Sequence, residues 1–499
     1  MLENFIAGSA ALFGDPFTIA IFVFGVIGGM LFGAIPGVSM LTLAAILLPF
    51  TSDLEPAQGV MLFAVIYCTG TYGGAITAIL FNIPGAPENA PTAFDGYPMT
   101  KQGRAGKAVG AAVLCSAIGG ISSALVMMAA TEPLAKWAIR NIGPPEIFAL
   151  VFFGLAVASS VGGRTIWKGW LSVLLGLMVA TIGQDPVGGI ERYNFGFADL
   201  AAGIAFVPAI LGFFAVSEIF VQAEKKVTGK YDAPPVGMSF PTILELWRYK
   251  IAVVRSILVG FFCGILPGIG ATLAAFMGYG EAVRWSKDKK SFGKGNMEGV
   301  ISSETANNAA TGAAMIPLLA LGLPGGALTA MMVAVFQMHD LEPGPLVFYN
   351  SPDLIWIVFA AMFYANLSIL IIGVMETKTI MYLLKVPFQF LAPMILLLAS
   401  IGSYIGRGLV LDVVVMFVAG ILGFLLRRSG YSIPGIVLGI ILGKIGEQNF
   451  AQGMQMVHYD LVTYFSRPIC TLLILAGVLT LGFSIYQAFQ GIKQKSPAS

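Results

Sequence analysis

The chain has 499 residues, of which 57% are hydrophobic and only 11% are charged, and its mean hydropathy is +0.85. Soluble domains carry about 25% charged residues, so this composition excludes a soluble protein. A helix of about 20 apolar residues crosses the roughly 30 Å of membrane hydrocarbon. Such stretches recur throughout, for example at residues 17–35, 108–129, 197–221, 354–375 and 468–486. We therefore expect an all-α integral membrane protein with about 12 transmembrane or half-membrane segments.

Few residues of this chain are suited to catalysis or to binding a transition metal. The four cysteines lie singly in apolar stretches and there are only two histidines, so we expect no disulfide, metal site or other cofactor. No nucleophile–base pattern points to an enzyme. The net charge of +2 gives no reason to expect nucleic-acid binding.

The first element in chain order is an apolar segment, residues 17–50, interrupted by Pro36-Gly37. No Lys or Arg precedes Lys101, so both ends of this segment are acidic and are expected outside the cytoplasm. A Pro-Gly break at membrane depth is tolerated where it lines a cavity or carries a ligand, although one isolated break is more simply explained as a kink. The candidates here are Gly37 and Ser39 for substrate, and Pro36 and Thr42 for a cation.

A second break, Pro84-Gly85, lies within residues 71–99, a stretch rich in small hydroxyl and amide side chains. For any single Thr, a hydrogen bond to its own helix is the alternative to ligand binding. The substrate candidates in this stretch are Tyr72, Gly73, Gly74, Asn82, Pro84 and Gly85, and the cation candidates are Thr71 and Thr77.

Basic residues then alternate with apolar segments in the way expected of membrane crossings. Residues 108–129 lead outward from a basic loop, and residues 147–161 return to Arg164. Arg192 falls on the outer side of this topology and is not explained by it. We divide the chain into membrane repeat one (1–221), a polar cytoplasmic linker (222–250), membrane repeat two (251–490) and a polar tail (491–499).

Repeat two opens with another broken segment, residues 251–280, in which Pro267-Gly268 is again followed by Thr-Leu-Ala-Ala. Both of its flanks are strongly basic, so it is expected to start and end on the cytoplasmic side, opposite to the first broken segment. Two related segments of opposite orientation indicate an inverted-topology repeat within one membrane domain. Gly268 is a substrate candidate here, and Pro267 and Thr272 are cation candidates.

Residues 304–330 contain the second break of repeat two, Pro324-Gly325. The stretch before this break is rich in small hydroxyl and amide residues. Asn307-Asn308 would bury four donors and two acceptors at membrane depth. Glu304 has two interpretations that stay open: an acid near a helix start, or a ligand for a cation or proton. The substrate candidates are Asn307, Asn308, Pro324 and Gly325, and the cation candidates are Glu304 and Thr311.

Paired breaks at corresponding positions of two halves indicate a transporter binding site. The freed N-terminus of a broken helix can hold a carboxylate through its N–H groups and partial positive charge. Unwound carbonyls with Ser, Thr and Asn oxygens suit Na⁺. We therefore expect a carboxylate to be carried together with Na⁺, with H⁺ as the alternative coupling ion.

Four stretches resemble the signature segments of the large membrane subunit of tripartite tricarboxylate transporters: GAIPG, YGGAITAILFNIPGAPENAPTAFDGYPM, GILPGIGATLAAF and SSETANNAATGAAMIPLLALGLPGGALTA. The similarity extends from about residue 10 to residue 485. It implies a multi-pass importer of citrate or related carboxylates in the bacterial inner membrane, driven by a cation gradient and moving in an elevator-like manner. It also implies two partners, a small four-helix membrane subunit and a periplasmic substrate-binding protein.

The alternative function is a stand-alone organic-anion exchanger that needs no binding protein. The two differ in whether uptake collapses when a binding protein is withheld. The sequence leaves open which carboxylate is carried, the ion stoichiometry, the topology of the last two segments and whether the protein forms a homodimer.

Overall fold

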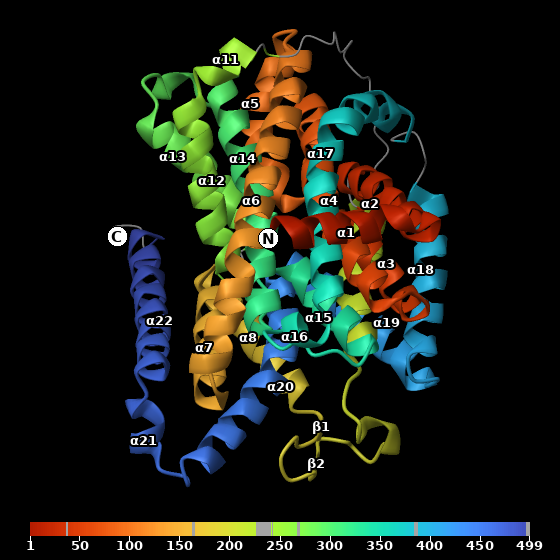
Figure 1. Ribbon diagram of the computed structural model, residues 1–499, viewed down its shortest axis with the longest axis vertical. Helices are drawn as coiled ribbons and strands as arrows, with labels where there is room; N and C mark the ends of the chain where they lie inside the picture. The colour runs from red at the N-terminus through yellow and green to blue at the C-terminus, as the bar shows by residue number, and fades with distance from the viewer. Residues whose placement is uncertain are drawn as a thin grey trace.

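The computed structural model describes residues 1–35, 38–161, 165–225, 241, 243–266, 270–383 and 388–495 (Figure 1). The helices before residue 226 are α1 (Leu2–Gly14), α2 (Pro16–Ala34), α3 (Met40–Leu47), η1 (Leu48–Asp53), α4 (Pro56–Phe81), η2 (Pro87–Asn89), α5 (Ala90–Lys101), α6 (Ala105–Asn141), α7 (Pro144–Val161), α8 (Ile166–Ala180), η3 (Ala198–Leu200), α9 (Phe206–Ile210), η4 (Leu211–Val216, a π-helix) and α10 (Ser217–Lys225). Two short antiparallel strands, β1 (Gly183–Gln184) and β2 (Glu191–Arg192), precede η3.

The helices after residue 242 are α11 (Ile243–Trp247), α12 (Lys250–Ile265), α13 (Gly270–Trp285), η5 (Lys289–Ser291), α14 (Met297–Leu321), α15 (Ala327–Met338), α16 (Val347–Asn350), α17 (Pro352–Leu383), α18 (Phe388–Ile405), α19 (Val410–Arg428), α20 (Ile433–Met456), α21 (Leu461–Ser466) and α22 (Pro468–Lys495). Within the described residues, seven helices are long and apolar enough to cross a membrane. This confirms the expected all-α, multi-pass membrane protein.

The helix boundaries follow ordinary capping chemistry. The Asp15 side chain accepts the Thr18 N–H at 2.8 Å, and Pro16 occupies the first position of α2, where its missing N–H costs nothing. Asn296 caps α14 by accepting the Glu298 N–H at 2.9 Å. Because α14 begins at Met297, Glu304 lies in the interior of this helix, and its interpretation as an acid near the helix start is wrong.

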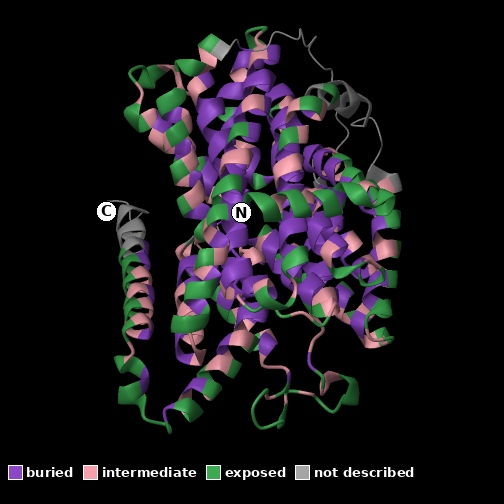
Figure 2. Cartoon of the chain, in the orientation of Figure 1, coloured by how far each residue is buried: buried purple, intermediate pink, exposed green. Residues whose placement is uncertain are grey.

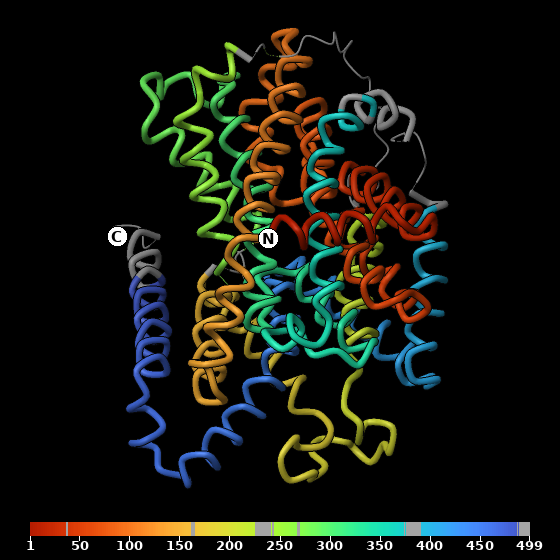
Figure 3. The backbone as a smooth tube through the Cα atoms, viewed as in Figure 1, coloured from red at the N-terminus to blue at the C-terminus, as the bar shows by residue number. Residues whose placement is uncertain are grey.

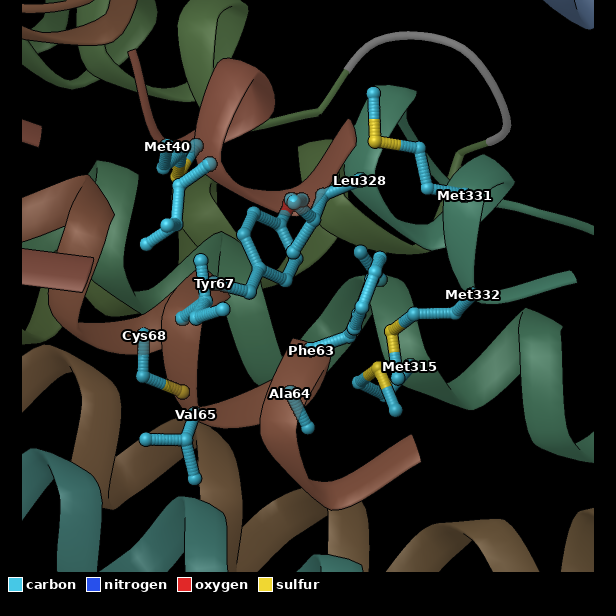
Figure 4. Close-up of a cluster of buried hydrophobic side chains, with 14 of the residues drawn as sticks. Met40, Phe63, Ala64, Val65, Tyr67, Cys68, Met315, Leu328, Met331 and Met332 are labelled. Atoms are coloured by element: carbon cyan, nitrogen blue, oxygen red, sulfur yellow. The ribbon is translucent and has the colours of Figure 1, made fainter. Parts of the chain in front are cut away.

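A central bundle is built around α4 and α14, two helices with almost every residue buried. Helix α14 packs against α6, α12 and α13, while α4 packs against α2 and α17. Figure 4 shows part of this core, where Phe63 and Tyr67 of α4 point toward Leu328, Met331 and Met332 of α15. Burial of such side chains in a bundle excludes lipid from the middle of the molecule, as the purple interior in Figure 2 shows.

Two smaller groups of helices flank the central bundle. The first flank, α7, α8, α20 and α22, packs mainly within itself, and the second flank comprises α9, η4, α10, α18 and α19. Close helix contact in both flanks depends on glycine, as is common between membrane helices. A Cβ at Gly176 of α8 would lie 2.1 Å from the Ile436 carbonyl oxygen of α20, and one at Gly212 of η4 would lie 2.3 Å from the Met416 carbonyl oxygen of α19.

The chain trace in Figure 3 shows α7, α8, α20 and α22 in the lower half of the view, whereas α5, α12 and α13 occupy the upper half. The segment expected at residues 197–221 becomes helical only from Phe206, because residues 183–200 form the β1–β2 region at the lower end. Arg192 lies in this region and forms a bidentate ion pair with Glu447 of α20, at 2.6 and 3.0 Å. This ion pair explains why a basic residue lies on the outer side, where the charge pattern predicted none.

Candidate functional site

Helices α4 and α14 end in the same way, each followed by an irregular connection that we call a hairpin end, residues 82–86 and 322–326. Asn82 and Gly322 terminate the two helices in the left-handed conformation, with φ of 58° and 76°. This conformation is unfavourable for most residues and is tolerated by Gly and Asn. The next N–H then reaches back into the helix in both cases, from Ile83 to the Thr77 carbonyl (3.3 Å) and from Leu323 to the Pro317 carbonyl (3.1 Å).

Each hairpin end touches the last turn of a broken helix. A Cβ on Gly85 would lie 1.9 Å from the Gly33 carbonyl oxygen near the end of α2. A Cβ on Gly325 would lie 2.9 Å from the Gly264 carbonyl oxygen near the end of α12. The sequence-predicted breaks at Pro36-Gly37 and Pro267-Gly268 lie outside the described residues, but the residues before them meet the hairpin ends.

A buried polar cluster lies between α5, α6 and α14, and we call it the carboxylate cluster: Glu88, Thr92, Ser116, Glu304 and Asn307. The Glu304 carboxylate accepts hydrogen bonds from the hydroxyls of Thr92 and Ser116, the latter at 2.9 Å, and from the Asn307 amide at 3.4 Å. Glu304, Thr92, Ser116 and Asn307 are fully buried, and Glu88 is nearly so.

Asn307 connects the two halves of the chain at this point. Its amide also donates to the Glu88 carbonyl at 3.4 Å, while its oxygen accepts from the Asn308 amide at 2.7 Å. The Thr272 hydroxyl of α13 donates to the Glu88 carboxylate at 3.4 Å. The structure therefore brings together four predicted site residues, Thr272, Glu304, Asn307 and Asn308.

The two acids of the cluster have no basic partner: none of the ion pairs among the described side chains includes Glu88 or Glu304. Burying an ionised carboxylate without a counter-charge is costly, and intramembrane acids of this kind commonly take a proton or a cation. The hydroxyl and amide oxygens around Glu304 are hard ligands of the type that alkali cations accept.

Several other predicted residues use their side chains within the protein. The hydroxyls of Thr71, Thr77 and Thr311 donate to carbonyls of their own helices, as expected of Thr in a membrane helix. The Tyr72 hydroxyl donates to the Gly373 carbonyl of α17 at 3.1 Å. Ser39 precedes α3 and forms no capping hydrogen bond, while Thr42 is buried in the first turn of that helix.

Two further predicted residues lie beside the first hairpin end. Gly73 and Gly74 of α4 pack against backbone: a Cβ at Gly73 would lie 2.2 Å from the Met30 carbonyl oxygen. A Cβ at Gly74 would lie 2.1 Å from the Asn89 side-chain oxygen and 3.0 Å from the Gly33 carbonyl oxygen. The Asn89 oxygen is buried and accepts no hydrogen bond from any residue that the structure describes, and it lies near the Gly33 carbonyl oxygen beside this hairpin end.

Sequence reasoning missed Glu88, Asn89, Thr92 and Ser116. Glu88 and Asn89 lie inside the conspicuous stretch 71–99, so an acid and an amide next to a Pro-Gly break were a usable signal. Ser116 carries no such signal, because it is one small residue in a long apolar helix. Its role depends on the packing of α6 against α14, which sequence periodicity does not specify.

Comparisons with known proteins agree on one family. The family described as "Tripartite tricarboxylate transporter TctA family" matches residues 19–438. An "Uncharacterized 52.8 kDa protein in TAR-I ttuC' 3'region" of Agrobacterium vitis is 35% identical over 478 residues, covering 94% of both chains. A second Agrobacterium vitis protein, from a TAR-II ttuC' 3'region, is 35% identical over 220 residues, 44% of this chain and 91% of its own length. No solved structure matches the chain.

Proposed function

Because the chain belongs to the tripartite tricarboxylate transporter TctA family, we propose that it is a cation-coupled importer of small tri- or dicarboxylates and the large subunit of a tripartite system. The observation that carries this proposal is that each of the two hairpin ends contacts the last turn of a broken helix. Beside them lies the carboxylate cluster, whose buried acids have no basic partner among the described side chains. Such irregular backbone at membrane depth is the usual setting of a transporter binding site.

The two halves of the chain are an inverted repeat. The matching ends of α4 and α14 support this, as do the matching approaches of Gly85 to Gly33 and of Gly325 to Gly264. The basic loops after α5 and α13 are at the upper end in Figure 1 and are assigned to the cytoplasm by the positive-inside rule. Both halves, 1–221 and 251–490, then form one domain in the bacterial inner membrane.

The substrate carboxylates bind at the hairpin ends and at the helices that follow the breaks. Helix α3 supports this part, because the Ser39 side chain does not cap it and the N-terminus of a helix favours an anion. The proposed substrate ligands are Gly37, Ser39, Tyr72, Gly73, Gly74, Asn82, Pro84, Gly85, Gly268, Asn307, Asn308, Pro324 and Gly325. Many contribute through backbone groups, so residue type does not reveal which carboxylate is carried.

The coupling cation neutralises Glu304 in the carboxylate cluster. Na⁺ is the proposed ion, because oxygen ligands surround the acid, and H⁺ is the alternative since Glu304 can itself take the proton. Asn89 and the Gly33 carbonyl add two oxygens beside the first hairpin end. Of the earlier cation candidates, Pro36, Thr42, Thr71, Thr77, Pro267 and Thr311 are retained only through their backbone carbonyls.

Transport proceeds by an elevator-like shift of the central bundle against the two flanks. The sparse packing between the bundle and the flanks supports this movement. A cavity of about 470 Å³ also lies between η1 and α15 of the bundle and α9, α18 and α19 of the second flank, beside the contact of Pro49 with Gly402. An interface that is not closely packed can slide at lower cost than a packed core.

Uptake into proteoliposomes tests this function. The chain is reconstituted with its small membrane subunit and its soluble binding protein, and labelled citrate and dicarboxylates are supplied under imposed Na⁺ or H⁺ gradients. We expect saturable uptake that needs one of the two gradients and the binding protein. Undiminished exchange without the binding protein would instead identify a stand-alone organic-anion exchanger.

A further inference from the structure

Residues 183–200 form a compact projection at the lower end of the molecule, which we call the β1–β2 arm (Figure 1). The two strands pair in register, Gly183 with Arg192 and Gln184 with Glu191. The Gln184 N–H also donates to the Ala201 carbonyl at 2.9 Å, and the Arg192–Glu447 ion pair ties the arm to α20. The arm is thus held in one conformation by the first flank.

The end of this arm exposes three aromatic side chains that contribute nothing to the core. Tyr193, Phe195 and Phe197 are 62%, 71% and 61% exposed, and the arm is mostly green in Figure 2. Tyr193 and Phe195 also adopt left-handed backbone conformations, with φ of 52° and 50°. Bulky aromatic residues rarely do so, and strain of this kind is concentrated at functional sites.

The arm is also acidic. Asp185, Glu191 and Asp199 lie on it, whereas the one basic residue, Arg192, is neutralised by Glu447. The Asp185 carboxylate accepts the N–H groups of Gly188 and Val187, at 2.7 and 3.2 Å, and these bonds lower its pKa below the ordinary value. Asp185 therefore stays ionised well below neutral pH, and the surroundings of the aromatic side chains remain negative.

We propose that the β1–β2 arm is the docking surface for a soluble protein partner that presents an apolar pocket rimmed by Lys and Arg. Rigid aromatic anchors surrounded by charge are typical of protein interfaces, where Tyr and Phe supply contact area at low entropic cost. Insertion into the membrane surface is disfavoured, because the acidic residues would be repelled by anionic headgroups. The inference rests on the proposed function, in which that partner is the soluble binding protein.

Binding measurements in lipid nanodiscs test the arm directly. The chain and its small membrane subunit are placed in discs of phosphatidylethanolamine and phosphatidylglycerol, and the purified soluble binding protein is the probe. We expect Phe195→Ser combined with Phe197→Ser to weaken binding at least tenfold. The double variant Asp185→Lys, Asp199→Lys should also weaken binding, and the loss of affinity should be larger at low salt than at high salt. Tyr459→Ser is the matched control, since Tyr459 is equally exposed and left-handed in the α20–α21 turn, and it should leave binding unchanged.

Unchanged affinity in both arm variants would overturn the inference. Tyr193→Trp gives a second measurement by comparison with the wild type, which already has six tryptophans. Additional quenching by brominated lipid that the binding protein does not relieve would show a membrane anchor and also overturn the inference. These results are separable from failure of the proposed function. If uptake by the wild type needs no binding protein, the function is wrong; if uptake needs it and the arm variants bind normally, only the docking surface is wrong.

Discussion

The carboxylate cluster and the apolar cluster of Figure 4 occupy matching positions on two similar hairpins, yet their chemistry is opposite. The helix ends at Asn82 and Gly322 differ by 240 in residue number (322 − 82). With the same difference, Ala64 corresponds to Glu304, Tyr67 to Asn307, Leu328 to Glu88 and Met332 to Thr92.

This difference shows that the two halves of the proposed repeat share the same backbone geometry although the side chains at matching positions differ in chemistry. Both hairpins keep the left-handed helix end and the close approach to a broken helix. The carboxylate cluster contains two buried acids, whereas the cluster in Figure 4 consists of Phe63, Tyr67 and other apolar side chains, including methionines. The proposed acidic coupling site thus has an apolar counterpart in the other hairpin, which stabilises the bundle.

The largest expected effect comes from placing an acid in the apolar cluster. Leu328→Glu buries a carboxylate among Phe63, Tyr67 and Met332, a group with fewer hydrogen-bond donors than the two hydroxyls and the amide around Glu304. The unfolding free energy should fall by about 3 kcal/mol or more. Leu328→Met conserves volume and should cost less than about 1.5 kcal/mol. Detergent-solubilised protein followed by thermal unfolding checks both, and equal stability of the two variants would refute the proposed contrast.

Removing the charge of the carboxylate cluster should abolish coupling without unfolding the protein. Glu304→Gln keeps the size of the side chain and one of its two acceptor oxygens, but it removes the negative charge that holds a cation or a proton. We expect gradient-driven uptake to fall by about 100-fold, comparable to the loss of one charged ligand. Glu298→Gln in the first turn of α14 is the matched control, since Glu298 pairs with Arg255 at 3.8 Å outside the cluster, and it should retain most of the uptake.

Before the structure, the sequence indicated the membrane class, most crossings and the two pairs of breaks, because hydropathy, charge and Pro-Gly dipeptides are local signals. It also pointed to Glu304, Asn307 and Asn308. The ligands of Glu304 from other helices, Thr92 and Ser116, depended on long-range packing and could not be predicted from a single sequence. Charge patterning likewise could not anticipate that Arg192 would be compensated by Glu447, 255 residues away in the chain.

The two hairpin ends differ in how tightly they pack. Gly85→Ala would drive a methyl group to 1.9 Å from the Gly33 carbonyl oxygen, whereas Gly325→Ala leaves 2.9 Å to the Gly264 oxygen. Overpacking of this kind costs about 1–3 kcal/mol, so Gly85→Ala should lower both stability and uptake more than Gly325→Ala. Gly280→Ala in α13, where a Cβ meets no atom within 4 Å, is the control and should be neutral or stabilising. Equal losses of stability and uptake in Gly85→Ala and Gly325→Ala would contradict this prediction.

The smallest expected effect concerns the left-handed end of α4 at Asn82, a conformation that glycine adopts freely. Asn82→Gly preserves this conformation and removes only the side chain. If the Asn82 amide is a substrate ligand, Asn82→Gly should raise the substrate concentration for half-maximal uptake several-fold at normal stability. An unchanged concentration would remove Asn82 from the site.

The ion stoichiometry tests the single coupling site most directly. In proteoliposomes containing the complete transporter, the reversal potential of substrate flux gives the number of cations moved with each carboxylate. We expect the residual flux of Glu304→Gln to move one cation fewer per substrate than the wild type, while the stoichiometry of Glu298→Gln is unchanged. The same stoichiometry in Glu304→Gln and wild type would contradict it.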